Sequence, residues 1–422
     1  MYHFKIIKLA IGSLLLLSTI YAQSALFLLI APGARAGGMG EAQVAVADDA
    51  YASYWNPAGL GFQEGYEIAG MHVNWLPGLV DDMYYDFLGG RAPVENLGVF
   101  GGHLIYLNAG EQQHTGPNGE DLGTFLTYFT SGALSYSTLI SERSSIGFNF
   151  KVLYQHLTDV TVGEEKTKGT ATNFGFDVGY LTKGYFGGRL DMGGMVSNLG
   201  PKVIFNDEEQ ADPMPTNLKL GLNMKVYESE FNSVNVVYDV NKLLVGKYAS
   251  MDWDGDMLIG GYNEDGSINP SGDYNADGQK EMPYTDSWWK GLFTSFLDDW
   301  YLGGDRDLDG DRMIGGYSAD TLAIAGGEYN SEGEMEVGNA DDRSMSDEFK
   351  SLIHSFGMEY WYNNMFAIRA GYYYDSEGKI ETPTIGAGLR YGNYGFDFGY
   401  VITSDETHPL NNTMRFSLSL EF

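Results

Sequence analysis

Short segments in which apolar side chains alternate with polar or small ones recur along this chain of 422 residues. In the last of them, every second residue from Met414 to Phe422 is apolar, and the residues between are Arg, Ser or Glu. Successive strand residues point to opposite faces, so a period of two predicts strands. Each segment is about ten residues long, as a tilted membrane-spanning strand is. A soluble sandwich would also alternate, but an apolar face that continues to the end of the chain favours a transmembrane barrel.

The alternation predicts fourteen strands, an even number, as is usual in bacterial outer-membrane barrels. The predicted strands are 66–76, 82–92, 97–108, 124–140, 144–158, 171–183, 185–199, 217–228, 232–244, 351–362, 365–376, 382–392, 394–403 and 413–422. The predicted fold is therefore all-β, a fourteen-stranded antiparallel barrel whose first nine strands occupy 66–244 and whose last five occupy 351–422.

The lengths of the connections support this assignment independently. Every gap after an even-numbered strand is short, and all the long gaps follow odd-numbered strands, the longest being the insertion at 245–350. Outer-membrane barrels have short periplasmic turns and long extracellular loops. We therefore expect both termini in the periplasm and the insertion outside the cell.

The N-terminal residues 1–22 have the composition of a secretory signal peptide. Lys5 and Lys8 precede an apolar run from Leu9 to Ile20, and Ala22 is the expected cleavage site. A retained signal anchor is the alternative, although the run is short for a membrane-spanning helix. No later stretch approaches the length of such a helix, so an exported form in a membrane must be a closed barrel.

Composition excludes several other classes of protein. The net charge of -32 argues against nucleic-acid binding, and the absence of cysteine removes thiol catalysis and zinc–thiolate sites. We also expect no enzyme. His354 and Ser355 are adjacent in a predicted strand and face opposite sides, and no nucleophile, base and orienting group occur together.

Residues 23–65, before the first strand, are rich in Gly and Ala and include the Asn56-Pro57-Ala58 element. This segment is too polar for lipid and could plug the barrel lumen. It resembles the N-terminal signature of the PorV/PorQ branch of the FadL-like outer-membrane proteins, in which the Asn-Pro-Ala element belongs to a hatch inside a fourteen-stranded barrel. A second stretch, Ser197–Lys202 followed by Pro213–Gly221, resembles PorV-like members in particular. The resemblance covers 23–244 and 351–422.

The resemblance implies one of two functions. PorV-like members serve the type IX secretion system, where they bind the C-terminal signal domain of exported cargo and carry it from the translocon to the attachment complex. The other FadL-like members take up hydrophobic compounds. The expected partners are therefore the translocon and attachment-complex proteins, cargo signal domains and outer-membrane lipid, with uptake as the alternative.

The insertion is strongly acidic and internally duplicated. Residues 246–348 contain 24 Asp and Glu against 6 Lys and Arg, a net charge of -18. Carboxylates at alternate positions around a Gly recur in three places, two of them offset by 55 residues. Such spacing can aim several oxygens at one Ca²⁺, although the closing Glu of an EF-hand is missing; solvated Asp-Gly turns are the alternative. The candidate calcium ligands are Asp252, Asp254, Asp256, Asp273, Asn275, Asp277, Asp305, Asp307, Asp309 and Asp311.

The insertion is also predicted to contain an amphipathic helix from Ser287 to Tyr301, capped by Thr285 or Asp286. Its aromatic face either packs within the insertion, which we expect, or docks a partner or covers the pore. The candidate docking residues are Trp288, Trp289, Phe293, Phe296 and Trp300.

Overall fold

A computed structural model describes most of the chain. The described residues are 25–78, 80, 82–115, 120–162, 167–205, 211–261, 272, 274, 278, 280–296, 305–316, 327–330, 333–338, 349, 351–376, 378–403 and 408–422. The predicted signal peptide, the candidate calcium ligands Asp273, Asn275 and Asp277, and the candidate docking residue Trp300 lie outside them. Residues 244–349 form one compact unit, and 24–243 with 350–422 form another.

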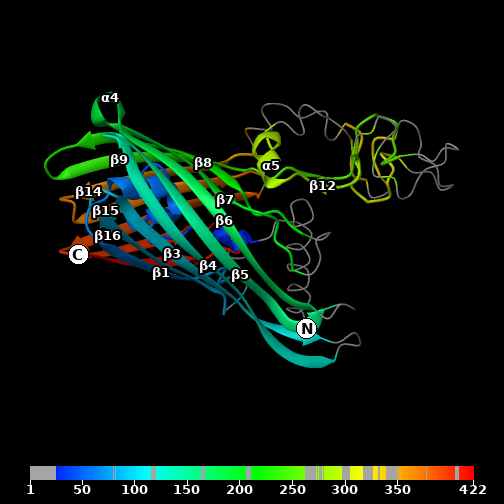
Figure 1. Ribbon diagram of the computed structural model, residues 1–422, viewed down its shortest axis with the longest axis horizontal. Coiled ribbons are helices and arrows are strands. Elements are labelled where there is room, and N and C mark those ends of the chain that lie inside the picture. The colour runs from blue at the N-terminus through cyan, green and yellow to red at the C-terminus, as the bar shows by residue number, and fades with distance from the viewer. Residues whose placement is uncertain are drawn as a thin grey trace. The chain divides into compact units, whose positions relative to one another are not determined.

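The larger unit is a closed barrel in which each strand pairs antiparallel with the next (Figure 1). Its strands are β1 (Glu67–Asn74), β2 (Tyr84–Val94), β3 (Gly98–Thr115), β4 (Asp121–Ser141), β5 (Ser144–Val162), β6 (Thr167–Gly184), β7 (Leu190–Leu199), β8 (Asn217–Glu228), β9 (Asn232–Leu243), β14 (Ile353–Tyr362), β15 (Phe366–Asp375), β16 (Ile380–Tyr391), β17 (Tyr394–Val401) and β18 (Met414–Glu421). β9 pairs with β14 across the insertion, and β1 pairs with β18 to close the ring. The predicted fold class is confirmed, with all fourteen strands present.

Some strand boundaries differ from the prediction for physical reasons. Leu190 begins β7 five residues later than predicted, because a short helical turn, α4 (Tyr185–Gly188), joins β6 to β7. β3 and β4 also extend into the predicted loop at 109–123, ending and beginning at Thr115 and Asp121. These extensions lack an apolar face, which is the feature the prediction relied on.

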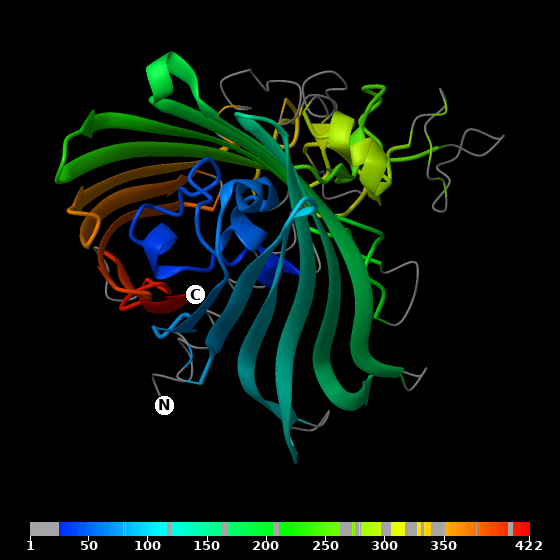
Figure 2. The same cartoon turned by 60° about the vertical axis from the view of Figure 1, so that its left-hand side comes forward.

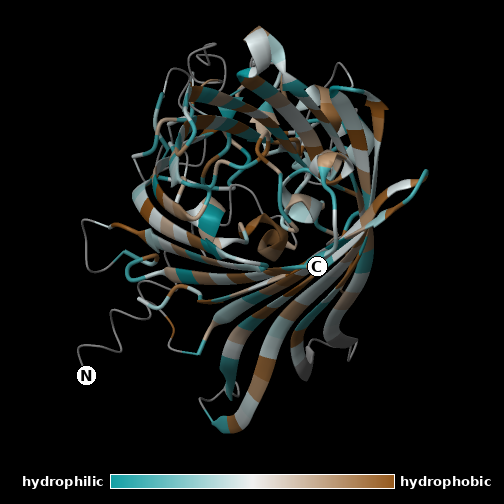
Figure 3. Ribbon diagram, turned by 90° about the vertical axis from the view of Figure 1, so that its left-hand side faces the viewer, coloured by the Kyte–Doolittle hydropathy of each residue, from teal (hydrophilic) through white to brown (hydrophobic). Residues whose placement is uncertain are grey.

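Outward and inward faces differ in the way that a membrane barrel requires. On β18, Met414, Phe416 and Leu418 are exposed, whereas Arg415 is buried. The same alternation of apolar and polar residues bands the other strands (Figure 3). The outer wall is thus apolar and the lumen carries polar groups, as in outer-membrane barrels. Among the described residues, no helix combines the length and apolarity needed to cross a membrane.

The insertion contains short elements only. β10 (Lys247–Tyr248) pairs with β12 (Tyr284–Thr285), and β11 (Met251–Asp252) pairs with β13 (Asp305–Arg306). The predicted helix is present but shorter, as α5 (Trp288–Thr294). Its N-cap is Ser287 without a side-chain capping bond, so the predicted caps are wrong. The Asp286 carboxylate instead accepts hydrogen bonds from Lys290 Nζ and Thr294 Oγ1, which holds that side chain beside the helix.

Candidate functional site: the luminal plug and the acidic insertion

The segment before the first strand lies inside the ring of strands (Figure 2). It contains η1 (Leu26–Leu29), α2 (Ala34–Gly37), α3 (Ala52–Trp55) and η2 (Pro57–Phe62). Within 31–60, every residue except Glu41, Asp48 and Asp49 is buried. We call residues 25–65 the plug.

The Asn-Pro-Ala element of the plug fits closely against the barrel wall. Asn56 Nδ2 donates to the carbonyls of Val44 (3.1 Å) and Tyr180 (3.0 Å), and Asn56 Oδ1 accepts from the backbone N–H of Ala58. Pro57 begins η2, where its missing N–H is not needed. A Cβ on the wall residue Gly179 would lie 2.2 Å from Asn56 Oδ1. The wall therefore leaves room for this element only because glycine is present there.

An ion-pair network joins the plug to the later strands of the barrel. Arg35 donates through Nε and Nη2 to both carboxylate oxygens of Glu359 on β14, at 2.9 and 2.8 Å. Glu359 also accepts from Arg369 Nε on β15 at 2.7 Å, and Arg369 pairs with Asp397 on β17 at 2.8 Å. Arg35, Glu359 and Arg369 are all at least nine-tenths buried. Buried charges of this kind persist only when they are paired, so the network ties the position of α2 to three strands.

Two wall residues, Asp239 and Arg415, form polar contacts with other parts of the plug. On β9, the fully buried Asp239 accepts from the backbone N–H groups of Gln43 and Val44, at 2.7 and 2.8 Å. On β18, Arg415 Nη2 lies 2.6 Å from Glu41 Oε1. The plug is therefore bonded to strands from both parts of the barrel sequence, on either side of the insertion.

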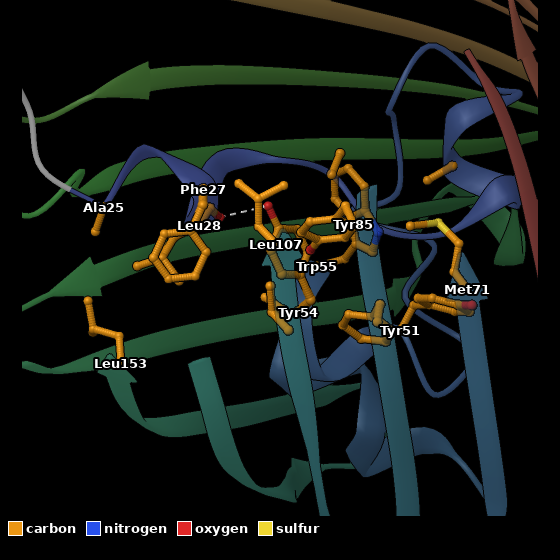
Figure 4. Close-up of a cluster of buried hydrophobic side chains, with 14 of the residues drawn as sticks. Ala25, Phe27, Leu28, Tyr51, Tyr54, Trp55, Met71, Tyr85, Leu107 and Leu153 are labelled. Atoms are coloured by element: carbon orange, nitrogen blue, oxygen red, sulfur yellow. Dashed lines mark hydrogen bonds between the residues drawn. The ribbon is translucent and has the colours of Figure 1, made fainter. Parts of the chain in front are cut away.

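An apolar cluster fills the space between the plug and the first strands of the barrel. Phe27, Tyr51, Tyr54 and Trp55 of the plug pack together with Tyr85 and other wall residues (Figure 4). Tyr51 stacks on Phe87 with ring centroids 4.9 Å apart, and the Trp55 indole donates to the carbonyl of Pro32. The Tyr54 hydroxyl donates to the carbonyl of Leu28, so Tyr54 and Trp55 have the hydrogen-bond partners that buried Tyr and Trp usually find.

The outer wall carries a row of aromatic rings across neighbouring strands. His72, Tyr84, Tyr106, Tyr128 and Tyr154 lie on β1 to β5, with successive ring centroids 5.6, 6.0, 6.0 and 6.1 Å apart. Tyr84 faces away from the lumen, because its neighbour Tyr85 is fully buried inside. Aromatic girdles of this kind mark the membrane–water boundary of outer-membrane barrels.

The structure brings together two of the three predicted calcium motifs. Oxygens of Asp252, Asp254 and Asp256 lie within 4.8 Å of one another, as do those of Asp307, Asp309 and Asp311. Asp305 is not part of the second group; it pairs with Asp252 between strands and accepts from the backbone N–H of Gly338. Both groups offer only carboxylate oxygens, the ligands that Ca²⁺ prefers.

Two glutamates complete these loops, and the sequence prediction missed them. Glu281 accepts from the backbone N–H groups of Trp253 (3.0 Å) and Gly260 (2.7 Å). In the second copy, Glu336 accepts from those of Leu308 (2.9 Å) and Gly315 (2.7 Å). Both side chains are buried, and burial raises the pKa of each carboxyl above its usual value. The sequence does contain a signal for both glutamates, because the segments 273–281 and 328–336 repeat at the same 55-residue offset as the Asp motifs.

The two copies also pair with each other. The backbone N–H of Ile259 donates to the carbonyl of Arg312 at 3.0 Å, and that of Ile314 donates to the carbonyl of Met257 at 3.1 Å. These bonds relate equivalent positions of the two repeats. The duplication is therefore a symmetric pair of loops, each closed by its own Glu.

The aromatic residues of α5 are exposed, contrary to the packing we expected. Trp288, Trp289 and Phe293 are 48%, 58% and 72% exposed, and within α5 only Gly291 is buried. Phe296, just after the helix, is 39% exposed. These rings are available for contact with another molecule.

One histidine contact could not be read from the sequence. His103 on β3 contacts Ser53 of the plug, with His103 Nδ1 3.1 Å from Ser53 Oγ. Both residues are buried, and His103 stacks on Phe87. The contact therefore joins the plug to β3 in the interior of the protein. His354 instead contacts the hydroxyl of Tyr238 on the outer wall.

A closed barrel with an apolar outer wall, an aromatic girdle and a lumen filled by its own N-terminal segment defines a plugged outer-membrane β-barrel protein. A sequence model described as "Type IX secretion system protein PorV" matches residues 18–249, which is 232 of the 422 residues. The chain belongs to this PorV family, a family of secretion proteins rather than of enzymes.

Several solved structures are similar to the chain. The toluene transporter TbuX of Ralstonia pickettii is 13% identical, with 94% of this chain and 100% of that chain covered and a TM-score of 0.46. The toluene transporter TodX of Pseudomonas putida is 13% identical, with 92% and 96% covered and a TM-score of 0.46. A FadL homologue of Pseudomonas aeruginosa is 9% identical, with 92% and 97% covered and a TM-score of 0.38. No curated protein sequence matches the chain.

Proposed function

We propose that this protein binds the C-terminal signal domain of cargo exported by the type IX secretion system and carries it from the translocon to the attachment complex. Its family supports this function, and the plug is the observation that carries the proposal. Residues 31–60 are almost entirely buried and are bonded to β9, β14 and β18. Uptake through the lumen would require these bonds to break, whereas cargo binding at the outer surface leaves them intact.

The orientation in the membrane is part of the proposal. The short turns and the end of β18 lie at one end of the barrel, and the long connections lie at the other. Both termini then face the periplasm and the insertion faces outward. The outer leaflet contacts the wall below the aromatic girdle.

The insertion is proposed to support docking. Asp252, Asp254 and Asp256, and likewise Asp307, Asp309 and Asp311, would each hold one Ca²⁺ that makes the loops rigid. The exposed rings of Trp288, Trp289 and Phe293 would contact the partner, since exposed aromatic side chains commonly anchor protein interfaces.

A pull-down between purified components tests this function. The bait is a soluble reporter fused to the C-terminal signal domain of a type IX cargo, and the control bait lacks that domain. We expect the detergent-solubilised barrel to be retained by the first bait only. A variant with 246–348 replaced by a short linker, and a Trp288→Ser/Trp289→Ser/Phe293→Ser variant, should lose retention while remaining folded.

Retention that is equal on the two baits would contradict cargo binding. The uptake alternative makes a different prediction, namely protein-dependent entry of a labelled hydrophobic compound into liposomes. Entry without selective retention would favour uptake instead.

A further inference from the structure

The connection between β6 and β7 presents the most exposed large hydrophobic side chain among those described. Phe186 in α4 is 82% exposed, and its neighbour Tyr185 is 44% exposed. Figure 1 shows α4 projecting from one end of the barrel wall. By strand order this is the end with the short turns.

The backbone at Phe186 is unfavourable for a bulky residue. Its φ of 47° and ψ of 51° lie in the left-handed region, where the side chain crowds the backbone. Gly184 and Gly187 adopt the same region without that cost. The turn itself is held by the backbone N–H of Gly184 bonded to Asp191 Oδ1 and by a Tyr185–Leu190 bridge. The fold would therefore be served better by glycine at 186, so the aromatic ring needs another explanation.

Phe186 borders a pocket of about 720 Å³. The other walls are Phe62, the turn residues Glu142 and Arg143, and Lys183. Lys183 Nζ lies 4.8 Å from the centroid of the Phe62 ring. Phe62 ends η2 and packs against inward-facing Leu181, so this wall of the pocket lies on the lumen side of the barrel.

The charges around this pocket differ from those of the whole chain. No ion pair involving Arg143, Lys183 or Arg189 is present among the residues that the structure describes, although the chain carries a net charge of -32. Glu142 is the one acidic residue of the lining. Cations that form no ion pair, beside an exposed aromatic ring, favour a ligand that is anionic and partly apolar.

We propose that this pocket docks an acidic peptide segment of a partner protein. An apolar side chain of the segment packs between Phe186 and Phe62, and its carboxylates face Arg143 and Lys183. The proposed orientation of the barrel is needed only to place this partner in the periplasm. The pocket lies in the barrel unit, so cargo binding by the insertion can fail without affecting it.

Peptide binding to the full-length protein in nanodiscs of neutral lipid tests the proposal. The probes are a flexible fluorescent Gly/Ser peptide that carries several Glu residues and one Phe, and a twin with Lys in place of each Glu. Fluorescence anisotropy should show the acidic peptide binding at least about tenfold more tightly than its twin at low salt. Phe186→Gly, which also relieves the backbone, should weaken binding about tenfold without loss of folding.

Arg143→Glu combined with Lys183→Glu should abolish the preference for the acidic peptide. Lys225→Glu is the control, because Lys225 is a partly exposed cation that already pairs with Glu228 at 2.8 Å. Equal affinity for the two peptides, or a Phe186→Gly variant that binds as tightly as the parent, would overturn the proposal.

Discussion

Removal of the Glu359 carboxylate should release the plug from the barrel wall. Glu359 accepts three charge-assisted hydrogen bonds, two from Arg35 and one from Arg369, at 2.9, 2.8 and 2.7 Å. In Glu359→Ala, both guanidinium groups stay buried and lose this partner. Each keeps another, because Arg35 contacts Asp48 and Arg369 contacts Asp397. The substitution changes no outward-facing residue, so the membrane contacts of the barrel are unaltered.

The magnitude follows from the cost of leaving a buried charge without its partner, about 3–5 kcal/mol. The remaining pairs place the expected loss near the lower value. Since about 1.4 kcal/mol is a tenfold change in an equilibrium constant, the population with the plug displaced should rise about a hundredfold. Glu359→Gln keeps the shape and loses the charge, so it should act in the same direction with a smaller effect.

The absence of cysteine makes the assay simple. Ser53→Cys places a thiol of similar size on a fully buried plug residue. Labelling of this thiol by a maleimide in detergent should be slow in the parent and much faster with Glu359→Ala. Glu381→Ala, which removes an exposed carboxylate from β16, is the control. A labelling rate in Glu359→Ala within about twofold of that control would refute our account of the network, since it would correspond to less than about 0.5 kcal/mol.

Three further predictions concern other parts of the molecule. Asn56→Ala removes buried hydrogen bonds to Val44, Tyr180 and Ala58 and should lower the stability of the folded barrel by about 1–3 kcal/mol. The measurement is the temperature at which the compact form is lost in gel electrophoresis, and an unchanged temperature would contradict the prediction. Glu336→Ala leaves the N–H groups of Leu308 and Gly315 without an acceptor and should speed proteolysis of the insertion, whereas the exposed neighbour Glu334→Ala should not. Removal of Ca²⁺ by a chelator should speed the same cleavage in the parent but not in Asp307→Asn/Asp309→Asn combined with Asp252→Asn/Asp254→Asn, and identical cleavage of the parent with and without chelator would argue against calcium.

The barrel could be predicted from the sequence because lipid imposes a simple rule. Each residue of a spanning strand faces either lipid or the lumen, so the period of two is visible wherever the strand crosses the membrane. This alternation is lost where a strand extends beyond the membrane. The extensions of β3 and β4 past Asn108 and before Thr124 are strands with water on both faces, and their sequences carry no alternation to detect.

The contacts of the plug could not be predicted in the same way. Arg35 and Glu359 are 324 residues apart, and nothing near either one identifies the other. The role of Glu281 and Glu336 could have been predicted from the sequence. Their common offset of 55 residues extends the duplication well beyond the Asp motifs, but a search for a Glu at the EF-hand spacing passes over them. The helix α5 was predicted in the right place, while its exposure depends on neighbours that a helical pattern does not specify.

The closure of the ring has a consequence for the order in which this protein can assemble. The strand that completes the ring is the last one made, and the carbonyl and N–H of Phe422 bond to Tyr66, the residue just before the first strand. The plug directly precedes Tyr66 and is enclosed on all sides by strands made after it. A chain whose last strand docks too early would shut its own N-terminal segment outside. Seating of the plug before, or together with, the pairing of β1 and β18 avoids threading the segment into a finished barrel through its mouth.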